Sequence, residues 1–559
     1  MNATRGTASP DTVPIRIPAQ PGPPEAERGP ARRRRRLARA AGAYWRSVAL
    51  LVPVLAVAGA VTGWNLQGWP GRADDDEGTY VAEAWAMLTE HHLSHYTYWY
   101  DHPPLGWGQI ALFGWVTDGF HRVSSEVMLG REFMWCLTLA GCTALFVTCR
   151  RLGLRRVTAA AAATLFAVSP LALWYHRMVS LDNIAVVWLL AALAIAASRR
   201  RSLGAAFWSA VALAIGILSK ETTVILAPVV VCVLWQHTRR QTRWWNLGIF
   251  GVTLSLLLAG YPLFAALRNE LLPGRGHVSL LWSLWWQFIA RAGSGSPLTA
   301  SSASHWLLNL WLELDPWLLG AGLALAAPAL AVRRLRPVAF ALLIQVLVPM
   351  KGGYLPYFYV TAMLPFAAAL VAGAGEALWL WFAGPRTRWI GRAVVAACAL
   401  AFAAGVAPQW WGELSAQARL DRDTASLAAT RWVERNVPPR AVVVVDDYIW
   451  PDLKLRGLNP LWMWKVDGDP RVSAVDLEHG WRSIGYVVVT PQAAELLSQM
   501  PVLNAAVEHS VVLANFGQGV TVRQVLSGPV APEATAAALQ PPPPEPGPPT
   551  RVRSPLIGR

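Results

Sequence analysis

Long apolar runs separated by short polar stretches occupy most of the chain between residues 48 and 408. An α-helix of about 17 to 25 apolar residues crosses the ~30 Å hydrocarbon core of a bilayer. The pattern therefore predicts a polytopic α-helical membrane protein with about eleven transmembrane helices. The predicted helices lie at 48–64, 128–149, 157–174, 182–198, 203–218, 222–237, 244–266, 306–332, 338–350, 355–382 and 389–408. Between two of them, the amphipathic and Trp-rich stretch Leu280–Ala290 predicts a helix on the membrane surface.

The arginines between the runs predict which side of the membrane each loop faces. Arg32–Arg36 precede the first run, and later arginines gather in five short loops, at 150–156, 199–201, 239–243, 333–336 and 386–392. Cytoplasmic loops carry an excess of Lys and Arg. A cytoplasmic N-terminus puts all five loops on the cytoplasmic side, and it puts the loop at 67–127 and the C-terminal region outside.

The region from 416 to 526 has the composition of a soluble domain. Strands at 441–445, 486–489 and near Val511 and Val520 alternate with helices at 425–435 and from Pro491. This order predicts a small extracytoplasmic α/β domain.

The remaining boundaries follow from these two regions. The predicted transmembrane domain covers 44–410 and contains the first outer loop, 67–127. The basic segment 1–43 and the Pro-rich segment 527–559 hold too few apolar residues to form a core, so both are predicted to be disordered tails.

Composition narrows the class of protein. The 559 residues are 54% hydrophobic and 15% charged, which excludes a soluble globular enzyme and a disordered protein. The net charge of +15 comes from arginines between apolar runs, where it sets topology, so no nucleic-acid partner is predicted. The five cysteines lie in apolar runs without a CxxC pair, which argues against a disulfide framework or a zinc site.

Candidate chemistry begins with the acidic run Asp74, Asp75, Asp76 and Glu77, at the start of the first outer loop. Adjacent carboxylates repel one another, which raises the pKa of at least one of them and suits it to act as a general base. The alternative is an acidic turn that caps a helix starting near Thr79, because acids favour helix N-termini.

A second unusual segment, Tyr98–Gly106, reads Tyr-Trp-Tyr-Asp-His-Pro-Pro-Leu-Gly. Its two prolines fix an extended turn and hold His102 and the aromatic side chains at the level of the lipid head groups. Alone, the segment is also typical of an interfacial aromatic belt. The combination with an acidic run earlier in the same loop is much less common.

This pair of motifs resembles glycosyltransferase family 39 of the GT-C superfamily, which includes protein O-mannosyltransferases and lipid A aminoarabinose transferases. In that family the first outer loop carries an Asp-Glu pair followed by an HPPL-like segment, which Asp76-Glu77 and His102–Leu105 match here. The resemblance implies the GT-C fold, an active site on the non-cytoplasmic face, and sugar transfer from a polyprenyl-phosphate donor.

Three further outer turns are similar to family elements. They contribute Arg177 and Asp182, then Lys220, then Lys351 and Tyr354. The resemblance implies that all five bind substrate and that Lys220 faces the lipid phosphate. Without the resemblance, the same residues have structural explanations: a snorkelling arginine beside a helix-capping acid, a local Lys–Glu pair, and a plain interfacial turn.

The chemistry of the transfer gives these residues their roles. A sugar on a polyprenyl phosphate leaves behind a phosphomonoester, whose charge needs Arg or Lys donors, here Arg177, Lys220 and Lys351. The attacking hydroxyl needs a carboxylate. Asp76 is the predicted base, with Glu77 as its catalytic partner and Asp75 as the alternative base.

Two assignments stay open within this scheme. Binding of the donor phosphate is one of several roles that the motif leaves open for His102. No cofactor is assigned, and a divalent metal at the acidic run is left without ligands, because adjacent acids alone do not form a coordination shell.

The sequence therefore predicts a glycosyltransferase that moves a hexosyl or pentosyl group to a protein, glycan or lipid hydroxyl at the outer face of a bacterial plasma membrane, with inversion. The alternatives are a polyprenyl-lipid transporter or flippase and a non-catalytic membrane scaffold. A transporter predicts paired repeats with broken helices and mid-membrane charges. A scaffold predicts that Asp76 is dispensable.

Overall fold

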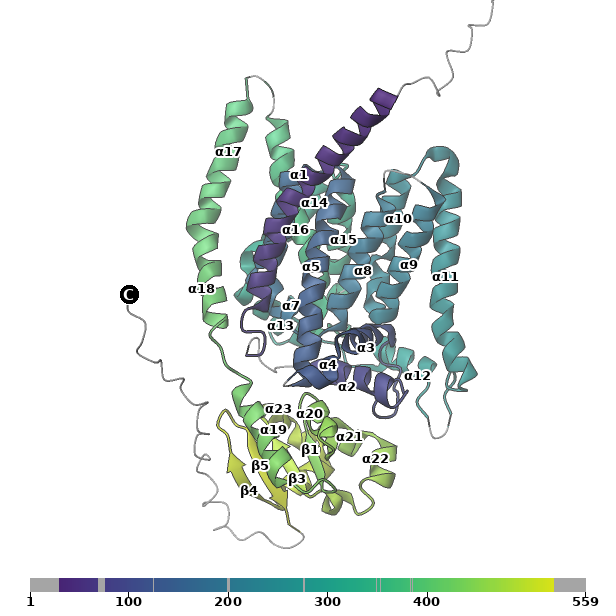
Figure 1. The fold of residues 1–559 in the computed structure, drawn as a ribbon, viewed down its shortest axis with the longest axis vertical. Coiled ribbons are helices and arrows are strands. Elements are labelled where there is room, and N and C mark those ends of the chain that lie inside the picture. Colours follow the sequence, from purple (N-terminus) through teal and green to yellow (C-terminus); the bar gives the residue numbers. More distant parts are fainter. Residues whose placement is uncertain are drawn as a thin grey trace, which may run out of the picture. The chain divides into compact units, whose positions relative to one another are not determined.

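The structure is a computed structural model. It describes residues 30–68, 76–123, 125–198, 202–274, 277–347, 349–351, 353–382, 384 and 386–526. The chain divides into two compact units, Met1–Leu50 and Leu51–Arg559. The second unit contains a helical part and, after it, a small sheet domain (Figure 1).

Five helical segments are long and apolar enough to cross a membrane. They run at Tyr44–Gly63, Glu126–Leu152, Arg240–Leu267, Tyr357–Trp381 and Trp389–Gln417. These segments overlap the helices α1 (Pro30–Gly63), α5 (Glu126–Leu152), α11 (Arg243–Leu267), α16 (Leu364–Trp381), α17 (Arg388–Ala401) and α18 (Ala407–Gln417). Because α1 begins at Pro30, part of the predicted N-terminal tail is helical, as its Ala, Arg and Leu content favours. Residues 1–29 and 527–559 lie outside the described residues.

Two bent helix pairs raise the number of candidate spans to seven. The helices α6 (Arg156–Val168) and α7 (Pro170–Arg177) meet at 65°, and α13 (Ala303–Leu314) and α14 (Pro316–Ala329) meet at 111°. At each break a capping residue precedes a proline, which lacks the N–H that would continue the helix. The hydroxyl of Ser169 at one break donates to Asp315 Oδ2 at the other at 2.5 Å, so the two breaks lie together.

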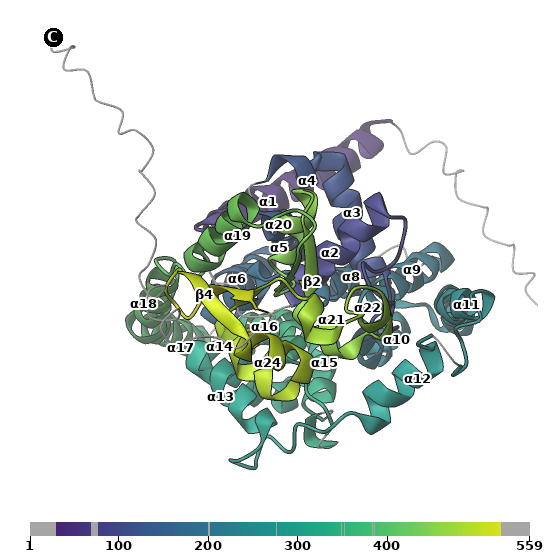
Figure 2. The same ribbon diagram turned by 90° about the horizontal axis from the view of Figure 1, so that it is seen from below.

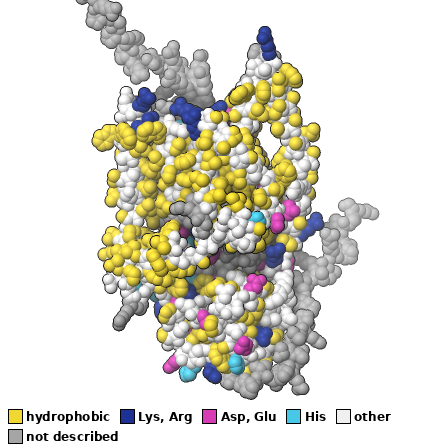
Figure 3. All heavy atoms as spheres, turned by 180° about the vertical axis from the view of Figure 1, so that it is seen from behind, with side chains coloured by type: hydrophobic (Ala, Val, Ile, Leu, Met, Phe, Trp, Pro, Cys, Tyr) yellow, Lys and Arg dark blue, Asp and Glu magenta, His cyan; other side chains and the backbone are white. Residues whose placement is uncertain are grey.

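The remaining predicted runs coincide with shorter apolar helices. These are α8 (Leu181–Ala196), α9 (Leu203–Ser219), η2 (Glu221–Leu226) continued by α10 (Ala227–His237), and α15 (Arg336–Leu347). Every predicted run thus overlaps an apolar helix, while five to seven spans meet the length criterion among the described residues. Apolar side chains cover the helices, and Lys and Arg side chains gather at one end of them (Figure 3).

The predicted C-terminal sheet domain is present. Its strands are β1 (Val442–Val445), β2 (Asn459–Trp462), β3 (Tyr486–Val489), β4 (Ser510–Asn515) and β5 (Thr521–Val525). They form one sheet in the order β2-β1-β3-β5-β4, in which β1 pairs in parallel with β2 and β3, and β5 pairs antiparallel with β3 and β4. The helices are α19 (Thr424–Asn436), α20 (Trp450–Leu455), α21 (Met463–Gly468), α22 (Pro470–Val475), α23 (Pro491–Leu496) and α24 (Pro501–Glu508). The sequence pattern missed β2, a four-residue edge strand that contains Pro460.

The predicted first outer loop contains three helices, α2 (Asp76–Thr89), α3 (Leu105–Thr117) and α4 (Gly119–Arg122). The helix α2 lies beside α20 of the sheet domain (Figure 2). Gly78 allows this approach, because a Cβ at that position would lie 2.1 Å from the backbone nitrogen of Tyr448. Further along α2, the rings of Trp85 and Trp450 meet edge to face, with centroids 5.5 Å apart.

Candidate active site

The acidic run ends at the first turn of α2. Asp76 is the first residue of the helix, where a carboxylate is stabilised by the helix dipole. Its Oδ2 accepts a hydrogen bond from the Tyr80 hydroxyl, one turn later, at 3.2 Å. Burial, and next the charge of Asp76, raise the pKa of Tyr80 well above its ordinary value, so its hydroxyl keeps the proton that it donates. Asp75, the alternative base, lies outside the described residues.

Glu77 is fully buried and paired with Arg131 of α5. Arg131 Nε and Nη2 donate to the two carboxylate oxygens of Glu77 at 3.0 and 2.8 Å, which is a bidentate ion pair. The backbone N–H of Val179 donates to Glu77 Oε1 at 3.0 Å. Glu77 therefore anchors the first turn of α2 and fixes the backbone next to Asp76.

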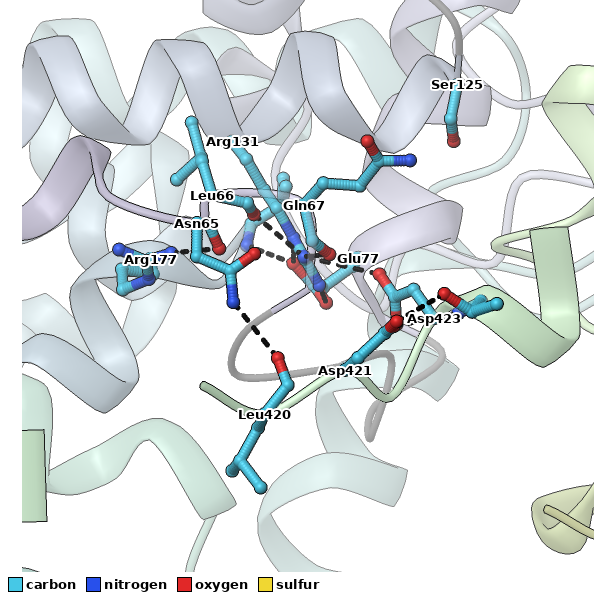
Figure 4. A network of polar contacts seen from close by, with 12 residues as sticks. Asn65, Leu66, Gln67, Glu77, Ser125, Arg131, Arg177, Leu420, Asp421 and Asp423 are labelled. Carbon is cyan, nitrogen blue, oxygen red and sulfur yellow. Dashed lines mark hydrogen bonds and ion pairs between the residues drawn. The ribbon is translucent and has the colours of Figure 1, made fainter. Parts of the chain in front are cut away.

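Arg131 also connects the end of α1 to the approach to the sheet domain (Figure 4). Its Nη1 donates to the carbonyls of Leu66 and Gln67 at 3.0 and 2.8 Å and lies 3.4 Å from Asp423 Oδ2. Asn65 donates in turn to two carbonyls of the segment before α19, those of Ala418 and Leu420, each at 3.0 Å.

Arg177 closes the same network from α7. It is fully buried, and it donates to the carbonyls of Val61, Thr62 and Asn65 at 3.2, 2.5 and 2.6 Å. These carbonyls lie at and just beyond the C-terminal end of α1, where backbone acceptors have no partner within the helix. Arg177 thus caps α1.

The HPPL segment holds His102 beside the junction of α9 and η2, where Lys220 and Glu221 lie. The Tyr98 hydroxyl donates to the His102 carbonyl at 2.7 Å, and Tyr261 of α11 donates to the same carbonyl at 3.3 Å. The imidazole Nδ1 lies 3.0 Å from Glu221 Oε2, and Nε2 lies 2.9 Å from the ammonium of Lys220. Since an ammonium can only donate, the imidazole Nε2 accepts from Lys220, and Nδ1–H donates to Glu221.

Asp182 completes the surroundings of Lys220. Lys220 Nζ lies 3.9 Å from Asp182 Oδ2, and both side chains are buried. Asp182 is in the first turn of α8, which Ser180 caps, and Lys220 is the C-cap of α9. The His102 and Tyr80 rings lie 6.3 Å apart, which joins these residues to the start of α2. We call this set of residues the polar cluster: Asp76, Tyr80, His102, Asp182, Lys220 and Glu221.

The structure does not bring every predicted residue into the polar cluster. Tyr354 packs against Arg291, whose guanidinium lies 3.3 Å from the ring centroid, and the described residues show no contact between Tyr354 and the polar cluster. Lys351 ends the short helix η5 (Pro349–Lys351), and its side chain lies outside what the structure describes. Among the described residues, no group of three or more His, Cys, Asp or Glu side chains is placed so that it could hold a metal ion.

Sequence reasoning missed several residues of the site. Arg131 is a cation within an otherwise apolar run, and such residues are expensive in a membrane, which was an available signal. Tyr80 follows Asp76 by four residues and therefore lies on the same face of a helix. Tyr261 gave no signal, because a tyrosine near the end of an apolar run is common.

Known proteins that resemble this chain are found both by sequence and by structure. Residues 101–263 match the family model described as dolichyl-phosphate-mannose-protein mannosyltransferase. The structure of ArnT from Cupriavidus metallidurans bound to undecaprenyl phosphate superposes with a TM-score of 0.58 and 16% identity, covering 86% of this chain and 99% of that one. The chain shares the fold of this ArnT structure. The apo oligosaccharyltransferase of Archaeoglobus fulgidus has a similar fold, with a TM-score of 0.52 and 12% identity, over 86% of this chain and 75% of that one. No curated protein matches the sequence.

The resemblance inferred from the sequence motifs is thereby confirmed. The part matched by this family model contains His102, Asp182, Lys220 and Glu221 of the polar cluster. It begins after Asp76 and Tyr80, which lie on α2 and reach the cluster only in the folded chain.

Proposed function

We propose that the protein is a membrane glycosyltransferase that moves a sugar from a polyprenyl-phosphate donor to an acceptor hydroxyl, with inversion at the anomeric carbon. The observation that carries the proposal is the polar cluster, in which a carboxylate on α2 and the Lys220–His102 pair meet although they lie far apart in the sequence. ArnT, whose fold is similar, was crystallised with undecaprenyl phosphate.

Lys220 binds the donor phosphate in this proposal, and His102, whose Nε2 accepts from the ammonium, holds Lys220 in position. The leaving group is a phosphate ester whose negative charge increases as the sugar departs, so fixed cationic and N–H donors stabilise the transition state. Asp182 and Glu221 hold these two side chains in place by an ion pair and a hydrogen bond. Arg177 is left out of the proposed phosphate contacts, because its donors serve carbonyls at the end of α1.

Asp76 is the proposed base. It orients the acceptor hydroxyl and takes its proton as that oxygen attacks the anomeric carbon. Since the leaving phosphate departs as an anion, the reaction needs no second acid. Tyr80 positions the Asp76 carboxylate, and Glu77 positions the turn that carries it. Asp75 remains the alternative base, and Lys351 and Tyr354 remain proposed substrate contacts.

The finer topology belongs to the same proposal. We infer about eleven membrane crossings, counting the shorter apolar helices of this packed bundle as spans. The arginine-rich loops support a cytoplasmic N-terminus, with the polar cluster and the sheet domain on the outer face of a bacterial plasma membrane. The proposed domains stay those predicted from the sequence, 44–410 and 416–526.

The deciding experiment compares wild-type protein with the Asp76→Asn variant in membranes. Each is given a panel of labelled polyprenyl-phosphate sugars, and the transfer of label and the release of polyprenyl phosphate are both measured. We expect one sugar to be transferred by the wild type and the rate to fall at least about 100-fold in the variant, the contribution typical of a general base.

A matched control makes the result specific. Asp118→Asn changes the same kind of residue in the same loop, where the side chain is 79% exposed and is expected to be dispensable. Equal transfer by Asp76→Asn and the wild type overturns Asp76 as base. A folded wild type that consumes no donor on the panel overturns the glycosyltransferase proposal and favours the transporter or the scaffold.

A further inference from the structure

A second polar site lies between α2 and the sheet domain, next to the polar cluster but outside the roles proposed for it. It consists of Glu83 of α2, Asp101 of the outer loop and Lys465 of α21. Glu83 is only 6% exposed, whereas Lys465 is half-buried and Asp101 is exposed. The side chains of these three residues form no hydrogen bond or ion pair with any residue in the described parts of the chain.

The loop that carries Asp101 is fixed to the sheet domain. His95 Nε2 lies 3.1 Å from Asp447 Oδ1, and Thr97 donates through its backbone N–H and its hydroxyl to Asp469 at 3.3 and 3.1 Å. These contacts between the outer loop and the sheet domain fix the relative positions of the elements that carry the site.

Aromatic rings hold the Lys465 ammonium in this site. Its Nζ lies 4.3 Å from the ring centroid of Trp99, 5.4 Å from that of Trp462 and 6.0 Å from that of Tyr96. Cation–π attraction keeps the charge in place but uses none of its three N–H donors. Of the acids around Lys465, Asp101 is the one whose charge acts most strongly on the ammonium, ahead of Asp469.

Glu83 lies on α2 within reach of the charges of Asp101 and Lys465. It follows Asp76 by seven residues, which is two helical turns, so both lie on one face of the helix. Burial, and next the charge of Asp101, raise the pKa of Glu83 well above its ordinary value. A protonated carboxyl group can both donate and accept a hydrogen bond.

We propose that Glu83, Asp101 and Lys465 bind the hydroxyls of a carbohydrate acceptor and present one of them to Asp76. The inference rests on the proposed function and deepens it by naming the acceptor class. A single Ser or Thr hydroxyl offers one donor and two acceptor sites, too few for three groups on three separate elements. A sugar ring offers several hydroxyls a few ångströms apart, and the ring of Trp99 beside Lys465 supplies apolar surface for such a ring to contact.

Acceptor binding and donor chemistry can be measured separately in the full-length protein in nanodiscs. A panel of octyl glycosides and a panel of Ser/Thr peptides serve as acceptors for the labelled donor. We expect transfer to a glycoside. Lys465→Ala should raise the KM for that glycoside roughly ten- to 100-fold, the effect of losing a hydrogen bond from a charged group. The same variant should leave the release of polyprenyl phosphate to water unchanged, because the donor site is intact.

Two comparisons test the assignment within the site. Glu83→Gln retains a group that donates and accepts and should keep transfer near the wild-type rate, whereas Glu83→Leu should lose it. Lys454→Ala is the matched control, because Lys454 also lies over two tryptophan rings of this region, at 6.0 Å from Trp85 and 5.6 Å from Trp450, but is no part of the proposed site. It should leave the acceptor KM unchanged.

Hydrogen–deuterium exchange adds a measure that does not need turnover. The octyl glycosides should protect peptides from 95–101 and 461–468 in the wild type and fail to do so in Lys465→Ala. No protection, transfer to peptides alone, or an unchanged KM in Lys465→Ala overturns the carbohydrate site. Protection by glycosides in a protein that releases no polyprenyl phosphate instead refutes the proposed function and leaves the site standing.

Discussion

At the scale of single residues, the buried pair of Glu77 and Arg131 decides where Asp76 lies. Both side chains are almost completely buried, and each neutralises the charge of the other. Removing one partner of such a pair leaves an uncompensated charge, which costs about 3–5 kcal/mol. Arg131→Ala should therefore lower the free energy of unfolding by about that amount, seen as a fall in Tm of the purified protein in detergent.

The control for this prediction is an exposed arginine at the end of α4, the helix before α5. Arg122 pairs with Glu132 of α5 at the surface, where exposed ion pairs contribute little, so Arg122→Ala should leave Tm unchanged. The double variant Glu77→Gln with Arg131→Gln should recover much of the loss, because the two buried charges of this bidentate pair are removed together. Equal Tm values for Arg131→Ala and the wild type would contradict the anchoring role of this pair.

Lys220 is the second residue whose removal has a specific consequence. If it stabilises the charge on the departing phosphate, Lys220→Ala should lower kcat by about 100- to 1,000-fold, the range for losing one such donor. Single-turnover kinetics with the labelled donor separates this loss from weaker binding. Should the variant change only the KM for the donor, Lys220 would bind the phosphate without stabilising the transition state.

At the scale of elements, the position of α2 depends on Gly78. A Cβ there would meet the backbone of Asp447 and Tyr448 at 2.1 to 2.3 Å, and backbone atoms cannot move aside as a flexible side chain can. Gly78→Ala should therefore displace α2 from the sheet domain and reduce transfer at least about tenfold. Gly108→Ala in α3 is the matched control, because its Cβ would meet only the Met87 side chain at 3.6 Å and should leave the rate unchanged.

The elements themselves were largely predictable from the sequence. The apolar runs overlap the helices that the structure contains, and the predicted strand 486–489 coincides with β3. The sequence also singled out Asp76, His102, Asp182 and Lys220 through their motifs. Each of these signals is local, since it depends on residues that are neighbours in the chain.

Contacts between distant segments were not predictable in the same way. The ion pair of Glu77 with Arg131 joins residues 54 positions apart, and the bond of Ser169 to Asp315 joins residues 146 positions apart. A periodic pattern of apolar residues does not encode which helices become neighbours. The sequence pattern also counts crossings without the bends of 65° and 111°, which shorten the straight helices.

At the scale of the whole molecule, the proposed reaction requires the polar cluster and the sheet domain to face the compartment that contains the acceptor. The first outer loop, with α2, contacts the sheet domain, so in the proposed topology both lie on one side of the bilayer and the arginine-rich loops lie on the other. Opposite faces of the membrane differ in their access to a charged, membrane-impermeant reagent. The two ends of the chain's helical part can therefore be told apart in intact cells.

Single cysteines introduced at exposed positions test this orientation. Glu478→Cys lies in the sheet domain and Arg240→Cys lies in an arginine-rich loop, and both side chains are exposed. An impermeant maleimide added to intact cells should label residue 478 at once and residue 240 only after the membrane is permeabilised. The five native cysteines lie within helices, and the unaltered protein measures their background. Labelling of residue 240 in intact cells would place the polar cluster on the cytoplasmic side, where it could not serve an acceptor outside the cell.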